Sequence, residues 1–452
     1  MKKLVLAACL PLLVTAGCGE LTIAEGEFEP GEGEGEGEGE GEGEGEGEDA
    51  PPPGSEARSA IPFNVSIDVD DSALAIAGDN ALRLALDLLD RNDETGNEVL
   101  SPVSVIEAFG MLSAGARGET LAQLESALRL LDQDQLHDVI NAWNVGFAAR
   151  NLPAQAADPA QGLGVADPVI LTLVNQLFQQ QGFSVEPAYL DTLSAHYDVG
   201  VQQVDFISDA EGIREDINAW VLDQTRTRIA NLLPPGSLST DTRLVLVNAL
   251  YLKAPWVTPF DATATADGTF HAADGDVTTS FLHGSQEGGF LALPGLDVVD
   301  IPLRGGALSL SLFIDRTAAG DEVADVGAGW AALSSLEPAL LQLSMPSFEL
   351  NTATNLKAAL EDLGVTDVFD AEVCDLDGIN AAEDLFVSGA FHKAFVALDD
   401  KGLEAAAATA IVVDTETSVP EVVTVDVNHP FTFVIRDRAL QAPLFVGRYV
   451  SP

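Results

Sequence analysis

Residues able to do chemistry are plentiful in this chain, but their spacing matches no catalytic motif. The 452 residues include 72 Asp and Glu, six His and three Cys. The motifs G-x-S-x-G, H-E-x-x-H, C-x-x-C and G-x-x-x-x-G-K-[ST], which place nucleophiles, metal ligands, dithiols or phosphate cradles, do not occur. Paired carboxylates arise by chance among so many acids, and Ser, His and Asp show no triad spacing. The sequence therefore predicts a protein that is not an enzyme and that needs no metal or other cofactor.

The amino terminus offers a different chemistry, the lipidation of a cysteine. Residues 1–18 (MKKLVLAACLPLLVTAGC) begin with two lysines, continue with an apolar run short for a membrane span, and end on small residues. The ending Val14 to Cys18 resembles a bacterial lipobox, which implies that Cys18 becomes the lipidated first residue. A plain secretory signal cut near the same place is the alternative. We expect an exported lipoprotein of the cell envelope or outer surface, bound to membrane only through its lipid, or else a secreted protein.

Residues 19–60 have almost nothing to bury. Gly31 to Glu48 alternates glycine with glutamate, three prolines follow at 51–53, and residues 19–58 hold 15 acids and one arginine. Backbone freedom and self-repulsion keep such a composition disordered. We predict a tether over 19–60 and a folded body over 61–452.

The charge of the chain limits its partners. A formal net charge of −51 repels phosphate backbones and anionic surfaces, so we expect no nucleic-acid partner. Solubility and a high-salt habitat are both open as reasons for this acidity. Cys9 lies in the signal and Cys18 would carry lipid, so Cys374 is the only thiol left in the body. No disulfide framework is then possible, and stability must come from core burial.

The body mixes helical and strand patterns without regular βαβ spacing, which predicts an α+β fold. Apolar residues recur at helical spacing over 73–89 and 213–222, and further helical runs over 107–130 are interrupted by Gly115 and Gly118. Runs rich in β-formers predict strands over 170–178, 243–252, 308–314 and 431–436.

Five segments of the body, in order, resemble the serpin family. They are 97–105 (NEVLSPVSV) with 111–120 (MLSAGARGET), 246–256 (LVNALYLKAPW) with Pro259-Phe260, 345–348 (MPSF) with 356–369, 386–395 (FVSGAFHKAF), and 429–431 (HPF) through 443–448 (PLFVGR). The resemblance implies one serpin domain with three β-sheets, about eight or nine helices and an exposed reactive loop. It also implies a mechanism, in which a protease attacks the loop, remains acylated, and is deformed as the loop inserts into the central sheet.

The reactive loop falls at about residues 400–428. An inserting strand must alternate one side chain inward and one outward. Starting at Leu403, the inward set would be Leu403, Ala405, Ala407, Thr409 and Ile411, which carries no charge that would oppose burial. The hinge and inserting residues are Gly402, Leu403, Glu404, Ala405, Ala406, Ala407, Ala408 and Thr409. Leu403 stands where inhibitory members usually have a small or β-branched residue, and its bulk favours slower insertion.

The family's usual loop lengths, counted from either side, place the reactive bond at Glu416-Thr417. A glutamate there favours a glutamyl-specific serine protease. Shifting the count by two gives Asp414, which suits aspartate-cleaving enzymes, and shifting it by one gives Thr415 or Thr417, closer to an elastase-like preference. A purely solvated acidic loop is the remaining interpretation.

Five further residues match positions that the family uses to control sheet opening: Ser101, Ser104, Asn248, His392 and Trp256. By chemistry alone the polar four would be satisfied buried groups and Trp256 a core aromatic. Residues 130–147 occupy the place where some relatives bind sulfated polysaccharide, but Asp132, Asp134 and Asp138 make such an activator unexpected.

Two functions of different classes follow. The first is a monomeric inhibitor of extracellular serine proteases, acting as a one-use substrate. The alternative is a non-inhibitory serpin-fold binding or structural surface protein whose loop never inserts productively, and a hydrolase on the same scaffold is a distant third.

Overall fold

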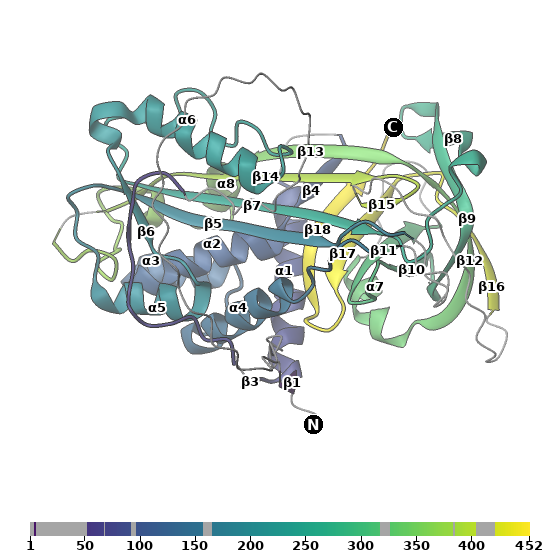
Figure 1. Ribbon diagram of the computed structural model, residues 1–452, viewed down its shortest axis with the longest axis horizontal. Helices are drawn as coiled ribbons and strands as arrows, with labels where there is room; N and C mark the ends of the chain where they lie inside the picture. Colours follow the sequence, from purple (N-terminus) through teal and green to yellow (C-terminus); the bar gives the residue numbers. More distant parts are fainter. Residues whose placement is uncertain are drawn as a thin grey trace, which may run out of the picture.

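A central sheet of seven strands runs through the fold (Figure 1). The computed structural model describes residues 4–5, 52–66, 68–91, 96–156, 165–316, 326–382, 385–403 and 421–452. In spatial order the strands are β13 (Phe348–Asn355), β14 (Val387–Leu398), β15 (Gly402–Leu403), β7 (Leu244–Pro255), β5 (Ile170–Gln180), β6 (Val201–Val204) and β2 (Ser55–Ala57). Strand β7 is buried over almost its whole length, because helices cover both faces of this sheet.

Helices lie on both faces of the central sheet (Figure 1). The lower layer contains α1 (Asp71–Leu89), α2 (Pro102–Gly115), α3 (Gly118–Ala127), α4 (Gln133–Ala148) and α5 (Pro187–Tyr197). The opposite face is covered by α6 (Phe206–Gln224), whose Ile217 and Val221 pack in one cluster with Phe178 and Val247. Helix α2 lies directly under the sheet and is buried on nearly all sides. Its start is fixed by Ser101, which accepts a hydrogen bond from the Ser104 N–H, and by Pro102 in the first turn.

The remaining large sheet has nine strands. They are β16 (Glu421–Asp426), β12 (Glu337–Pro346), β9 (Gly275–Leu293), β10 (Leu296–Pro302), β11 (Leu308–Asp315), β17 (Phe431–Asp437), β18 (Ala442–Tyr449) and β4 (Glu98–Leu100), with β8 (Ala266–Ala272) beside β9. The expected second and third sheets are continuous here, because β9 pairs with β8 near one end and with β10 near the other. Two shorter helices, α7 (Val326–Ala332) and α8 (Leu356–Asp362), complete the eight α-helices of the described residues.

The elements predicted from periodicity are confirmed. The helices over 73–89 and 213–222 are α1 and part of α6, and the four predicted strands are β5, β7, β11 and β17. Gly115 and Gly118 separate α2 from α3 as predicted. Within the described ranges, no helix is both long and apolar enough to cross a membrane.

The amino-terminal side of the body differs from the predicted boundary at residue 61. Ser55–Ala57 forms β2, which pairs antiparallel with β6 at the edge of the central sheet. Glu56 accepts a hydrogen bond from the Gly200 N–H at 3.0 Å, and Arg58 forms an ion pair with Asp198. The predicted tether over 19–60 therefore ends in a segment that belongs to the sheet. The backbone of β1 (Leu4–Val5), within the predicted signal peptide, pairs with β3 (Asp68–Val69).

Candidate functional site

Two central strands of the sheet, β14 and β7, separate at one end, and the start of the predicted reactive loop lies between them. Strands β14 and β7 pair in parallel from Val387 to Ala394. Beyond that point β15 enters, and it pairs antiparallel with both neighbours: Leu403 lies opposite Leu398 on one side and Ala254 on the other. The Leu403 side chain is 2% exposed. The structure therefore places the predicted hinge residue inside the sheet, so its bulk is accommodated there.

A tight turn directs the chain into this position. Asp399 Oδ1 accepts hydrogen bonds from the backbone N–H groups of Lys401 at 2.8 Å and Gly402 at 3.1 Å. Burial raises the pKa of the Asp399 carboxyl, and these two N–H groups oppose that shift. Gly402 has φ of +145°, and a Cβ there would lie 2.5 Å from the Pro255 Cα. Only glycine fits both that dihedral angle and that spacing.

Trp256 contacts this turn directly. Its indole Nε1 donates to the Asp399 carbonyl at 3.0 Å, and its backbone N–H donates to the Lys401 carbonyl at 2.9 Å. The Phe260 N–H donates to the Asp400 carbonyl at 2.7 Å, and the Phe260 ring packs edge-on against Trp256 with centroids 5.7 Å apart. Trp256 is therefore a buried aromatic residue and also a hydrogen-bond partner of the predicted hinge, while its role in sheet opening stays a prediction.

The polar residues predicted to control sheet opening lie together beneath β7 and β14. The Ser101 N–H donates to His392 Nε2 at 3.0 Å, and His392 Nδ1 is 2.8 Å from Asn248 Oδ1. Asn248 Nδ2 donates to the Ser104 carbonyl at 2.5 Å. Burial lowers the pKa of His392 to about 3, so its imidazole is neutral. Ser104 takes part through its backbone, because its hydroxyl has no hydrogen-bond partner among the described residues.

Sequence reasoning missed three members of the same cluster. Asn248 Nδ2 also donates to Asn175 Oδ1 on β5. Asn175 Nδ2 donates to Glu107 Oε2 at 2.6 Å, and Asn144 Nδ2 on α4 donates to Glu107 Oε1 at 2.6 Å. Burial raises the pKa of Glu107 to about 8. One sequence signal was available, since Glu107 is the only charged residue in the largely apolar sequence of α2.

Several predicted site residues lie outside the part of the chain that the structure describes. They are Glu404, Ala405, Ala406, Ala407, Ala408 and Thr409 of the inserting loop, the reactive pair Glu416 and Thr417, and the lipidation residue Cys18. The described residues stop at Leu403 of β15 and resume at Glu421, the first residue of β16 in the nine-stranded sheet.

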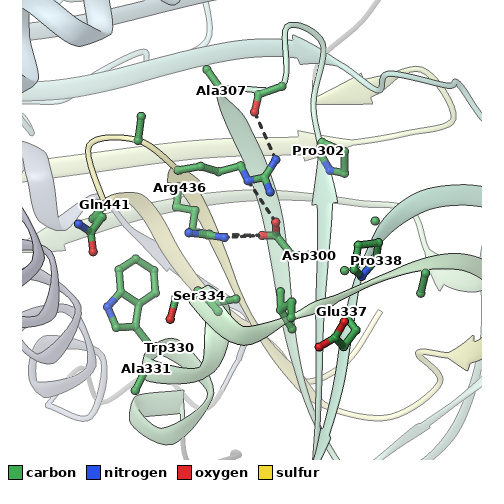
Figure 2. Close-up of a pocket in the computed structure, with 18 of the residues that line it drawn as sticks. Asp300, Pro302, Ala307, Trp330, Ala331, Ser334, Glu337, Pro338, Arg436 and Gln441 are labelled. Carbon is green, nitrogen blue, oxygen red and sulfur yellow. Dashed lines mark hydrogen bonds and ion pairs between the residues drawn. The ribbon is translucent and has the colours of Figure 1, made fainter. Parts of the chain in front are cut away.

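A cavity with a volume of about 1550 Å³ lies away from this site, between α1, α7 and the nine-stranded sheet. Figure 2 shows Arg436 directed at Asp300 on its wall. Asp300 Oδ1 accepts from Arg436 at 3.2 Å and from the hydroxyls of Ser309 at 2.7 Å and Ser311 at 2.6 Å. Because these partners occupy the Asp300 carboxylate, the cavity wall shows structural ion pairing instead of a base beside a nucleophile.

The described residues offer little support for metal binding or for a reactive thiol. No three His, Cys, Asp or Glu residues there are grouped to hold a metal ion. Burial and neighbouring acids raise the pKa of Cys374 to about 12, so its thiol is inert at neutral pH.

Comparison with known proteins assigns most of the folded body to one family. The family model "Serpin (serine protease inhibitor)" matches residues 77–452. A leukocyte elastase inhibitor from Xenopus tropicalis is 32% identical over 380 residues, covering 80% of this chain and 95% of that protein. The protein Iris from Ixodes ricinus is 32% identical over 387 residues, covering 82% of this chain and 98% of that protein.

Solved structures agree with this assignment. Serpin48 from the insect Tenebrio molitor superimposes with a TM-score of 0.68 at 25% identity, covering 85% of this chain and 99% of that one. The thermophilic serpin tengpin in its native state gives a TM-score of 0.72 at 20% identity, covering 88% and 98%, and this second likeness shows the fold alone.

Proposed function

Since the chain belongs to the serpin family, we propose that it inhibits serine proteases as a one-use substrate whose cleaved loop becomes a new strand between β7 and β14. One observation carries the proposal. Strand β15 already lies between these two strands and is antiparallel to both, while they are parallel to each other. Extending β15 would replace one parallel pairing by two antiparallel pairings, which are the more stable kind per residue.

The register of β15 determines where each later loop residue would lie. Leu403 opposite Leu398 and Ala254 puts Thr409 opposite His392 and Asn248 if the strand continues without a bulge. Leu403 faces the core with Leu398 and Ala254, so alternation sends the inward set to the same face. That set is Ala405, Ala407, Thr409 and Ile411, all small or apolar enough to bury.

The covalent step belongs to the protease. Its serine Oγ attacks the carbonyl carbon of the reactive residue, the following peptide bond breaks, and the proton from Oγ passes through the protease's own base to the new amino group. With Glu416 as the reactive residue, the leaving amine is that of Thr417. Insertion then separates the acyl-enzyme ester from the leaving amine, and the burial and strand pairing gained drive that movement.

Glu416 makes glutamyl-specific serine proteases the leading targets of this proposal. Asp414, Thr415 and Thr417 are the neighbouring candidates, and they correspond to aspartate-cleaving or elastase-like enzymes. We place the inhibitor outside the cytoplasm as a monomer, held by a lipid on Cys18 at the end of the Gly/Glu tether. The exposed Asp132, Asp134 and Asp138 on α4 argue against a sulfated polysaccharide as activator, because like charges repel.

The test uses the full mature chain and a glutamyl endopeptidase, analysed on denaturing gels. We expect a covalent complex that survives heat and detergent, and a released fragment whose first residue is Thr417. Glu416→Ala is the matched control, and it should lose the complex with this protease. Clean cleavage at Glu416 without any complex would favour the second candidate, a serpin-fold binding protein whose loop does not insert.

A further inference from the structure

The hydrogen bonds beneath the central sheet run in one direction. The Ser101 backbone N–H can only donate, so His392 Nε2 accepts and the ring proton is on Nδ1. That proton goes to Asn248 Oδ1. The Ser104 carbonyl can only accept, so Asn248 Nδ2 faces it, and the other Nδ2 hydrogen goes to Asn175 Oδ1. Backbone groups at two points therefore fix the orientation of every amide in this chain of bonds.

The chain of bonds ends on Glu107. Since Asn175 Oδ1 is used as an acceptor, its Nδ2 must donate, and Glu107 Oε2 receives it at 2.6 Å. The path starts at the N-cap of α2, crosses β14, β7 and β5, and returns to α2 at Glu107. Each donor in this chain of hydrogen bonds needs an acceptor, and Glu107 is the last acceptor. The hydrogen bonding of the whole chain therefore depends on the Glu107 carboxyl group.

Few groups other than amides surround the Glu107 carboxyl. Asn144 approaches from α4 and Asn175 from β5, and within the described part of the chain Glu107 has no ion pair. Tyr197 of α5 is a titratable neighbour that interacts electrostatically with Glu107, and its hydroxyl would lie 2.9 Å from a Cβ placed at Gly110, one turn after Glu107.

Further titratable groups lie around Tyr197 on α4 and α5. The Tyr197 hydroxyl is hydrogen-bonded to His137 Nδ1 of α4 at 2.8 Å. The His196 ring of α5 packs against the His137 ring. Burial lowers the pKa of His137 to about 4, and burial raises that of Tyr189 on α5, so both are neutral near pH 7. His392 faces the set from β14, while the charged side chains of α1, α3, β7 and β18 are exposed or half-exposed.

We propose that Glu107 is a positioning residue for loop insertion: by accepting the last bond of this chain, it sets how firmly β7 is held to β14 and so how fast the sheet opens. This inference rests on the proposed function. A strand entering between β14 and β7 must break the His392–Asn248 bond, because these residues are partners in the parallel ladder. The hydrogen bond from Asn248 to Asn175, which Glu107 holds in place, restrains Asn248 and so opposes the separation of β7 from β14.

Ionisation of Glu107 would favour the opened sheet. The hydrogen bonds from Asn144 and Asn175 favour the carboxylate, but burial without a cation beside it opposes the charge more strongly. Opening admits water above α2, and a carboxylate gains more from that water than a neutral acid does. Sheet opening should therefore be faster on the alkaline side of the Glu107 titration, whose pKa is about 8.

The experiment measures how fast the uncleaved full chain takes up a labelled synthetic peptide with the sequence of residues 403–414. Rates are compared from pH 6 to pH 9.5 for the wild type, Glu107→Gln, Glu107→Ala and the control Asn80→Ala. Glutamine keeps an acceptor for Asn175 and does not titrate, so its rate should be slow and independent of pH. Alanine leaves the Asn175 amide unpaired, so uptake should be about tenfold faster or more at every pH. Asn80→Ala removes an amide of α1 that donates to the Arg129 carbonyl outside the cluster, so its rate should stay within about twofold of wild type.

The possible outcomes distinguish failure of this inference from failure of the proposed function. Uptake by wild type that rises around pH 8, and a flat profile for Glu107→Gln, support the proposal. Uptake at equal rates and with equal pH dependence in wild type and Glu107→Gln overturns it alone, even if the alanine variant does not fold. If the wild-type sheet takes up no peptide at any pH, the proposed function fails and this inference falls with it.

Discussion

Replacing Leu403 with glutamate should prevent the cleaved loop from entering the sheet. Leu403 is 2% exposed, and its partners across both strands are the buried Leu398 and Ala254. Losing this buried leucine forfeits about 1.5–3 kcal/mol, and an unpaired carboxylate in its place costs about 2 kcal/mol or more. A total near 4 kcal/mol corresponds to about a thousandfold shift of the hinge from docked to undocked. Because β15 is only two residues long, the rest of the fold should remain intact.

The assay needs no knowledge of the natural target. A broad-specificity protease cuts the loop between residues 404 and 420, and thermal unfolding is followed before and after the cut by circular dichroism. Wild type and the matched control Leu403→Val should gain a large rise in melting temperature, whereas Leu403→Glu should gain little. An equal rise in Leu403→Glu would refute the reasoning, since insertion would then not proceed through the β15 position.

Three further predictions concern the hinge, the cluster below the sheet and the edge strand. Gly402→Val would force a Cβ to within 2.5 Å of the Pro255 Cα, so its rise in melting temperature after cleavage should be smaller than that of wild type; an unchanged rise contradicts this. The pKa of His392 is lowered from 6.5 to about 3, so its stabilisation is present above pH 6.5 and is lost as the pH falls towards 3. Urea unfolding between pH 6.5 and 4 should lose about 1.4 kcal/mol per pH unit from this group, and His392→Gln should lack that slope. Deleting residues 52–58 removes β2 and its bonds to β6, so the free energy of unfolding in urea should fall by about 1–3 kcal/mol, and an unchanged value would mean that β2 adds nothing to the sheet.

Some of this site was predictable because its residues have strong local preferences. Ser101 precedes a proline and an apolar run, which predicts a helix start, and β-formers surround Asn248 and His392 on their strands. Once α2, β7 and β14 are placed in one fold, Ser101, Asn248 and His392 can contact one another only beneath the sheet. The family resemblance supplied that arrangement, and the geometry places them in hydrogen-bond contact.

The residues that were missed depend on contacts between elements far apart in sequence. Glu107 could have faced solvent at the edge of α2; only the packing of α4 and β5 around that helix buries it against Asn144 and Asn175. Ser55–Ala57 follows a proline run and has no strand signature of its own. It becomes β2 because β6 presents an unpaired edge beside it. Neither contact can be read from local periodicity.

The docked hinge also explains how one register can be selected for the rest of the loop. A slip of one residue would exchange the two faces of the inserting strand, and Glu404 would then take the inward position in place of Ala405. Because Leu403 is already held between Leu398 and Ala254, the direction, the face and the starting partners of the strand are set before any cleavage. In the proposed insertion, a strand continuing from that start would bring Thr409 between His392 and Asn248, and its hydroxyl could replace the bond that its arrival breaks. The proposal thus joins the hinge and the cluster beneath the sheet: the hinge would fix which residue meets the cluster, and the cluster would set the resistance to its entry.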